Sequence, residues 1–292
     1  MSEHPHRIAF SRRIRHLETI EMGFGIRTAY RKAFRSTLFS LGYHVVEQTD
    51  TVAILHLMRK LCPLDCGVDM VRIGGDSDGG YLVPNDLDGI EYCFSPGVNT
   101  CAEFESQLAD RGIKSFLADY SVDSPPVDRP EFIFDRKFLG PFDRDNWFTL
   151  STWKDKYLAN YRGDLILQMD IEGFEYETIL TTPLNLLRQF RIAVIEFHGL
   201  DRLFDSFVFG RLSSCFEKLL EVFNVVHIHP NNSGESIIRG AIEIPEMMEF
   251  TFLNKSRCAM TTPVRQFPHR LDRDNSLTAR PLVLANCWRS NL

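Results

Sequence analysis

The chain has 292 residues, enough for one large domain or two small ones. Its 44% hydrophobic content excludes wholesale disorder, and its formal net charge of −6 argues against a dedicated binder of duplex nucleic acid. The charge is uneven, because residues 1–40 hold eight Arg or Lys against three Glu, a net +5 that leaves −11 for the rest. We therefore expect two parts with different roles.

Residues 1–69 are expected to form a helical extension. Residues 8–40 have a helical pattern interrupted by Gly23 and Gly25, and residues 51–61 form a better helix behind the possible cap Asp50. Arg residues stand where a signal peptide needs an apolar core, and no apolar run reaches the ~20 residues of a membrane span. We expect a cytoplasmic protein whose basic extension is either a solvated helical face or a docking surface for a partner or second copy.

Seven cysteines lie at irregular spacing. Their odd number does not suggest a disulfide framework, and the close pair Cys62 and Cys66 has no second pair to complete a zinc site. We therefore expect free thiols in a reducing compartment.

From residue 91 onward, short apolar segments alternate with helical patterns. The predicted strands are 91–95, 115–119, 131–135, 165–170, 193–198, 225–230 and 248–254, with helical stretches at 100–111, 173–190 and 206–223. Alternation of this kind is typical of a doubly wound sheet whose strands are buried on both faces. The sequence therefore predicts one α/β domain over residues 70–292, with a seven-stranded, mostly parallel sheet and helices on both faces.

The first of these strands is followed by a turn and a helix that suit a nucleoside ligand. Gly97 lets the turn approach a ligand closely, and Thr100 and Glu103 have the spacing of a capping box. Asp119 closes the next strand, 22 residues after Gly97, where an acidic group can accept hydrogen bonds from ribose hydroxyls. The full GxGxxG pattern of dinucleotide sites is absent. This segment favours an adenosine ligand without a diphosphate, such as S-adenosylmethionine.

Several strings resemble the FkbM-type methyltransferases, most closely the subgroup that opens with an R-I-G…D-G-G-Y element. They are VRIGGDSDGGYLV (71–83), SPGVNTCAEFE (95–105), LADYSVD (117–123), LQMDIEGFEYETIL (167–180), IEFHGL (195–200) and HIHPNN (227–232). The resemblance covers roughly residues 70–255. It implies a class I, Rossmann-like, S-adenosylmethionine-dependent fold and O-methylation of a hydroxyl on a sugar or another small metabolite.

The resemblance also assigns a cofactor site. Gly97 lies by the methionine part of the cofactor and Asp119 lies on the ribose. Asp78 to Tyr81 form the edge of the pocket. Asn99 and Tyr120, which belong to the same motifs, complete the expected site. Many members read S-F-G-V-G where this chain has Ser-Pro-Gly-Val-Asn at 95–99, so the second glycine is missing.

Polar side chains cluster after the fourth and fifth predicted strands. Asp170, Glu172 and Glu175 surround the end of the fourth strand, and Glu196 and His198 close the fifth, two residues apart and on one face. The carboxyl ends of neighbouring parallel strands meet at one edge, so these groups should converge. A hydroxyl acceptor must lose its proton as the methyl group arrives, so His198 or Glu172 could act as the base. Asp170, Glu196 and His198 could instead hold Mg²⁺ or Mn²⁺.

Structural roles compete with these assignments. Asp170 could cap the following helix, and Glu196 could be a structural carboxylate bonded to a neighbouring turn. His227 fits an edge strand, whereas His229, Asn231 and Asn232 could reach the same site. Two other functions also remain open, a nicotinamide-dependent oxidoreductase on a similar sheet and a non-catalytic binding or assembly protein that keeps the fold.

Overall fold

The computed structural model describes residues 24–43 and 45–289. The chain divides into two compact units, Met1–Glu47 and Gln48–Leu292, whereas the sequence-based division falls between residues 69 and 70. The difference arises from α3 (Thr51–Lys60), because this helix buries Ile54, Leu57 and Met58 in the core of the larger unit. In the smaller unit, α2 (Phe24–Ser40) forms part of the predicted 8–40 helix, and residues 8–23 lie outside the described residues.

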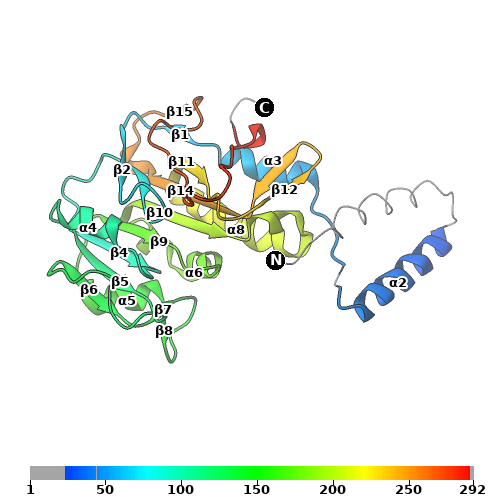
Figure 1. Cartoon of the computed structure of the whole chain (residues 1–292), viewed down its shortest axis with the longest axis horizontal. Helices are drawn as coiled ribbons and strands as arrows, with labels where there is room; N and C mark the ends of the chain where they lie inside the picture. Colours follow the sequence, from blue (N-terminus) through cyan, green and yellow to red (C-terminus); the bar gives the residue numbers. More distant parts are fainter. Residues whose placement is uncertain (1–23, 44, 290–292) are drawn as a thin grey trace. The chain divides into compact units, whose positions relative to one another are not determined.

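A seven-stranded sheet forms the centre of the larger unit (Figure 1). Its strands overlap all seven predicted ones. In spatial order they are β11 (Phe223–Pro230), β14 (Met247–Asn254), β10 (Phe190–His198), β9 (Leu165–Met169), β4 (Tyr92–Pro96), β5 (Lys114–Ala118) and β6 (Phe132–Asp135). The predicted α/β class and strand number are thus confirmed.

The sheet is mixed, which corrects the prediction of a mostly parallel one. Four neighbouring pairs are parallel, and both pairs made by β14 are antiparallel. The cause is the connection from β11 to β14, which is the hairpin of β12 (Ser236–Arg239) and β13 (Ile242–Pro245) with no crossover helix. Adjacent parallel strands usually need such a crossover, so β14 returns antiparallel.

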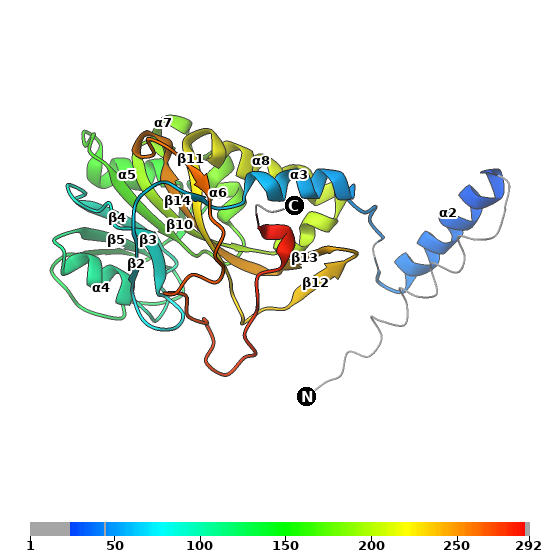
Figure 2. The same cartoon turned by 90° about the horizontal axis from the view of Figure 1, so that it is seen from above.

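Different elements cover the two faces of the sheet (Figure 2). One face packs against α3, α5 (Leu150–Leu158), α6 (Glu175–Thr181), α7 (Leu184–Leu187) and α8 (Ser206–Val222), around a core that includes Trp153 and Trp288. The other face lies under α4 (Glu103–Ala109) and the hairpin of β2 (Met70–Ile73) and β3 (Tyr81–Pro84). The helix predicted over 173–190 is broken into α6 and α7 at Pro183, which has no N–H to continue a helix.

The order of the strands reverses between β4 and β9. From β4 the chain proceeds outward through β5 to β6, then returns to β9 beside β4 and proceeds outward in the other direction through β10. In open α/β sheets, ligands bind beyond the carboxyl ends of the strands at such a switch point. The fold therefore predicts a ligand site among the residues that follow β4, β5 and β9.

The remaining elements are short. They are the pair β1 (Leu64–Asp65) and β15 (Thr262–Pro263), the pair β7 (Phe138–Leu139) and β8 (Trp147–Phe148), and the 3₁₀ helices Leu200–Phe204, Lys255–Arg257 and Asn286–Trp288. All seven cysteines lie within the described residues and are free thiols, as predicted. In the part of the chain that the structure describes, no helix is both long and apolar enough to cross a membrane.

Candidate functional site

A cavity of about 520 Å³ lies at the switch point of the sheet. Of the predicted site residues, those that line it are Asp78, Tyr81, Gly97, Asn99, Asp119, Asp170 and Glu172. Among the described residues, the lining does not include Tyr120, Glu196 or His198. Most of the predicted cofactor residues therefore share one cavity, and Asp170 and Glu172 connect it to the predicted chemical group.

The turn after β4 lies directly against the end of β9. Gly97 has φ +87°, a conformation that L side chains rarely adopt, and a Cβ at this position would lie 1.5 Å from the carbonyl oxygen of Asp170. Helix α4 begins at Glu103 behind Ala102, which provides no side-chain cap. The predicted capping box of Thr100 and Glu103 is therefore wrong, because Thr100 lies too early in the turn.

Asp119 is buried and held by the turns around it. Its Oδ2 accepts the backbone N–H of Asn99 at 2.9 Å, and its Oδ1 accepts both the backbone N–H and the hydroxyl of Ser121 at 2.7 Å. A carboxylate has about four acceptor positions, of which three are occupied here. The Ser121 hydroxyl would have to turn away for two ribose hydroxyls to bind together.

The loop between β2 and β3 folds back on itself beside the cavity. Arg72 fixes it by donating from Nε to the Gly75 carbonyl at 2.7 Å and from Nη2 to the Ser77 carbonyl at 3.0 Å. A Cβ on Gly80 would lie 2.0 Å from the Gly75 oxygen, so the loop cannot close this tightly with a larger residue. The sequence 76–80 is thus a turn before a strand, as predicted, and this turn brings Asp78 to the cavity.

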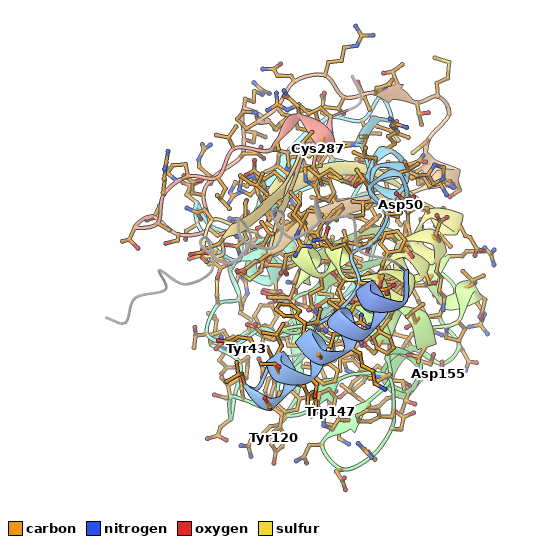
Figure 3. All side chains as sticks on the ribbon, turned by 90° about the vertical axis from the view of Figure 1, so that its right-hand side faces the viewer. Tyr43, Asp50, Tyr120, Trp147, Asp155 and Cys287 are labelled. Carbon is orange, nitrogen blue, oxygen red and sulfur yellow. The ribbon has the colours of Figure 1, made fainter. Side chains whose placement is uncertain are left out.

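Aromatic rings form another wall of the cavity. Trp147 contacts Phe174 at 4.6 Å and Phe138 at 4.9 Å between ring centroids, and all three line the cavity. Tyr120 packs on Phe138 at 5.3 Å, behind this wall. Figure 3 shows Tyr120 and Trp147 at the same end of the larger unit. Trp153, in contrast, is fully buried in the core.

His198 lies among four carboxylates. Its Nδ1 is 3.2 Å from Glu175 Oε1, and its Nε2 is 3.5 Å from Glu172, 3.7 Å from Glu196 and 3.8 Å from Asp170. Asp170, Glu196 and His198 each offer a ligand atom within 4.8 Å of the others. The convergence predicted from the ends of β9 and β10 is present, and it includes the buried Glu175.

Burial and mutual charge shift the ionisation of this group. Burial lowers the pKa of His198, but the hydrogen bond and charge of Glu175, with Asp170 and Glu172, raise it overall. Burial raises the pKa of Asp170 to about 7 against the opposing effect of His198. Burial, with the charges of Asp170 and Glu249, also raises the pKa of Glu196. The group therefore retains protons near neutral pH.

Three buried oxygens of this group have no hydrogen-bond donor. They are Asp170 Oδ1, Glu175 Oε2 and Glu196 Oε2. Buried acceptors without a donor are costly, so the arrangement fits a cation or a ligand donor between them. The donor set of two carboxylates and one imidazole suits Mg²⁺ or Mn²⁺.

Of the two structural roles considered for these carboxylates, the structure contradicts that of Asp170 and supports that of Glu196 in part. Asp170 does not cap α6, since the N-cap position is Phe174 and no side chain makes a cap hydrogen bond there. In the turn before α6, Glu175 Oε1 accepts the N–H groups of Ile171 and Gly173 at 3.1 and 3.0 Å. Glu196 Oε1 accepts Asn231 Nδ2 at 2.8 Å, so one of its oxygens is held by a neighbouring turn. Glu196 thus has one oxygen, Oε1, in a hydrogen bond and one, Oε2, without a donor.

The histidines of β11 face another partner. His227 Nε2 lies 3.0 Å from Asp272 Oδ1 and His229 Nδ1 lies 3.7 Å from Asp272 Oδ2, and these histidines hold the pKa of Asp272 well below its usual range against the effect of burial. Asn232 bonds to Ser276. Of His227, His229, Asn231 and Asn232, the described hydrogen bonds thus join only Asn231 to the His198 group.

Sequence reasoning missed several lining residues. Phe138, Phe174, Glu105 and Gln168 all line the cavity. Glu105 is an acidic residue on the buried side of α4, directly facing an apolar strand, and that contrast was the available signal. The aromatic residues carried no such signal, because Phe is common throughout this chain.

Comparison with known proteins gives only distant likenesses. No protein-family profile and no curated protein matches the sequence. A candidate DNA modification methyltransferase encoded within an E. coli prophage aligns with 57% of this chain and 47% of its own, at 11% identity and a TM-score of 0.37. A TehB-like SAM-dependent methyltransferase from Corynebacterium glutamicum aligns with 80% of this chain and 100% of its own, at 14% identity and a TM-score of 0.32. Likenesses this weak establish neither a shared fold nor a shared activity, and this chain spans about half of the first protein.

Proposed function

We propose that this chain is an S-adenosylmethionine-dependent O-methyltransferase that acts on a hydroxyl of a carbohydrate or another small polar metabolite. The observation that carries the proposal is the acidic lining of the cavity at the switch point, which contains no basic residue among those described. Five acidic residues line it, namely Asp78, Glu105, Asp119, Asp170 and Glu172, and no Lys, Arg or His does so in the described part of the chain. Such a cavity suits a cationic nucleoside and repels the diphosphate of a nicotinamide dinucleotide.

The topology supports the same assignment. Numbered along the chain, the strands of the sheet lie in the order third, second, first, fourth, fifth, seventh and sixth, with the seventh antiparallel to its neighbours. The resemblance found in the sequence implies a class I methyltransferase fold with a seven-stranded sheet, and this sheet has seven strands. Within it, Asp119 would take the ribose, with Gly97 and Asn99 beside the methionine part. Gly97 lines the cavity and has to be glycine, because the Asp170 carbonyl oxygen occupies the space of a Cβ.

The bound cofactor would supply an electrophilic methyl group, and the residues around His198 would prepare the acceptor. Methyl transfer needs the acceptor oxygen in line with the methyl carbon and a base for its proton. Glu175 would orient His198 through Nδ1 and leave Nε2 free to take that proton. Glu172, which is exposed and lines the cavity, is the alternative base. A divalent cation held by Asp170, Glu196 and His198 would acidify the hydroxyl instead.

The acceptor class and location complete the proposal. The ring of Trp147 and the carboxylate of Glu172 line one cavity, and an apolar face beside hydrogen-bond acceptors suits a sugar or polyol.

Free cysteines fit a reducing, cytoplasmic location. The basic N-terminal segment would serve oligomerisation or docking, and the acidic cavity does not suit nucleic acid.

The proposal is tested by titrating S-adenosylmethionine into wild-type protein and the Asp119→Ala variant in a calorimeter. We expect wild type to bind one equivalent and the variant to bind at least about tenfold more weakly, since it loses charge-assisted hydrogen bonds to the ribose. Asp123→Ala is the matched control, because Asp123 is an exposed carboxylate of the same loop that pairs with the surface residue Arg136. Unchanged binding by Asp119→Ala would show that the cofactor assignment is wrong.

A further inference from the structure

A buried carboxyl group lies beneath the turn after β4, at the inner side of the cavity. Glu105 projects from α4, is only 3% exposed and lines the cavity. Its Oε1 is hydrogen-bonded to the hydroxyl of Ser95 on β4, which also lies 2.6 Å from Gln168 Oε1 on β9. Gln168 Nε2 points the other way and donates to the Tyr81 hydroxyl at 3.3 Å. Side chains from β3, β4, α4 and β9 thus form one buried polar cluster among apolar residues.

This group has too few donors for its acceptors. A hydroxyl carries a single hydrogen, so Ser95 cannot donate to Glu105 and to Gln168 together. If Glu105 were ionised, the one Ser95 hydrogen would have to serve two acceptor oxygens away from bulk water, which is unfavourable. Burial raises the pKa of Glu105 to about 7, although the Ser95 hydrogen bond opposes the shift. Near neutral pH, Glu105 therefore holds a proton that supplies the missing donor.

We propose that Glu105 and Gln168, which line the cavity and are linked from behind by the buried Ser95, form the subsite for a primary ammonium group, which is the α-ammonium of S-adenosylmethionine if the proposed function holds. An ammonium has three N–H donors and no acceptor, so it matches an acceptor-rich group. A sulfonium has no N–H and would leave the same oxygens without donors. On binding, the Glu105 carboxyl releases its proton to solvent and becomes the carboxylate that pairs with the ammonium, so the charge of the subsite balances.

The charged surroundings agree with this assignment. The titratable groups around Glu105 are Cys93 on β4, Cys101 before α4, Tyr81 on β3, and Asp78 and Asp170 across the same cavity. Arg72 on β2 is a cation of the hairpin that covers this face of the sheet, and it is already bonded to the carbonyls of Gly75 and Ser77. None of the described residues that line the cavity therefore supplies a cation for Glu105, and a ligand can supply one.

The test compares three ligands at pH 8 by calorimetry. S-adenosylmethionine carries the ammonium and the sulfonium, S-adenosylhomocysteine carries only the ammonium, and 5′-methylthioadenosine carries neither. We expect Glu105→Gln to weaken the first two by about tenfold and the third by less than about twofold. Glutamine mimics protonated Glu105 in size and donors, so this variant should fold. Glu103→Gln is the matched control, an exposed glutamate on the same helix, and should change none of the three.

A second readout follows the released proton. Below pH 7, binding of S-adenosylhomocysteine to wild type should release a proton that Glu105→Gln does not release, as measured in two buffers of different ionisation enthalpy. Equal weakening of all three ligands would make Glu105 a structural residue, and weakening of S-adenosylmethionine alone would place the sulfonium there. Either result overturns the inference while leaving the cofactor assignment intact. Failure of wild type to bind any of the three would overturn the proposed function itself.

Discussion

The chemistry of this protein centres on His198 and the carboxylates around it. Strand ends and two-residue spacing were enough to predict that Asp170, Glu196 and His198 converge, because cross-strand neighbours must meet at one edge of a sheet. The role of Glu175 could not be predicted. It depends on the path of the 171–174 turn, in which Glu172 has φ +55°. Such turn geometry is set by tertiary contacts rather than by residue type.

We expect His198→Ala to lower the rate of methyl transfer by about 10²–10⁴-fold with little effect on cofactor affinity. Cofactor affinity should change little because His198 is not among the described residues that line the cavity. The rate should fall because His198, the proposed base, lies beside Asp170, which does line it. The measurement is transfer of a labelled methyl group to a panel of sugars and polyols. His56→Ala, an exposed histidine of α3, is the control. Normal turnover by both His198→Ala and Asp170→Ala would rule out this chemical site.

At the scale of elements, the apolar strands were predictable and their directions were not. Inner strands such as β9 and β10 are buried on both faces, so each appears in the sequence as a short continuous apolar run. The antiparallel direction of β14 depends on how β12 and β13 pair, which no run of residues in β14 encodes. Helix α5 was also missed, since its residues follow an Asp-rich loop and its cap, Thr149, is fixed by Asp143.

The turn between β4 and α4 offers a matched pair of substitutions. Gly97 and Gly112 both have positive φ, +87° and +81°, so alanine should cost about 1–2 kcal/mol of backbone energy at either position. Only Gly97 has a carbonyl oxygen, that of Asp170, in the space of a Cβ. We therefore expect urea unfolding to give a clearly larger loss of stability for Gly97→Ala than for Gly112→Ala. Equal losses would contradict the close approach of β4 and β9.

At the scale of the whole molecule, the uneven charge of the sequence divides between the two units. α2 carries basic residues and no acidic residue, whereas the larger unit gathers buried carboxyl groups at the ends of its strands. The sequence predicted the division of charge. It could not predict that Glu105 and Asp170 keep protons, since both pKa values of about 7 result from burial in the folded state.

Stability should therefore fall as pH rises through the range of these groups. In the folded state Glu105 keeps its proton up to a pKa of about 7, whereas in the unfolded chain it loses the proton above about pH 4.5. Unfolding between these pH values therefore releases a proton, and a rise in pH favours the unfolded state until pH 7 is passed. Glu105→Gln removes one such group. Between pH 5 and pH 8, the free energy of unfolding should therefore fall by up to about 3 kcal/mol more in wild type than in this variant. Urea unfolding at both pH values measures this. Identical pH dependence in the two proteins would contradict a buried, protonated Glu105.

The central claim, that the acidic cavity at the switch point takes a cationic nucleoside, is tested most directly by parallel calorimetric titrations. The full chain would be titrated with S-adenosylmethionine and, separately, with NAD under the same conditions. We predict saturable binding of one S-adenosylmethionine and no detectable binding of NAD, because the diphosphate would face five acidic residues and no lining cation among those described. Tight binding of NAD without binding of S-adenosylmethionine would contradict the account.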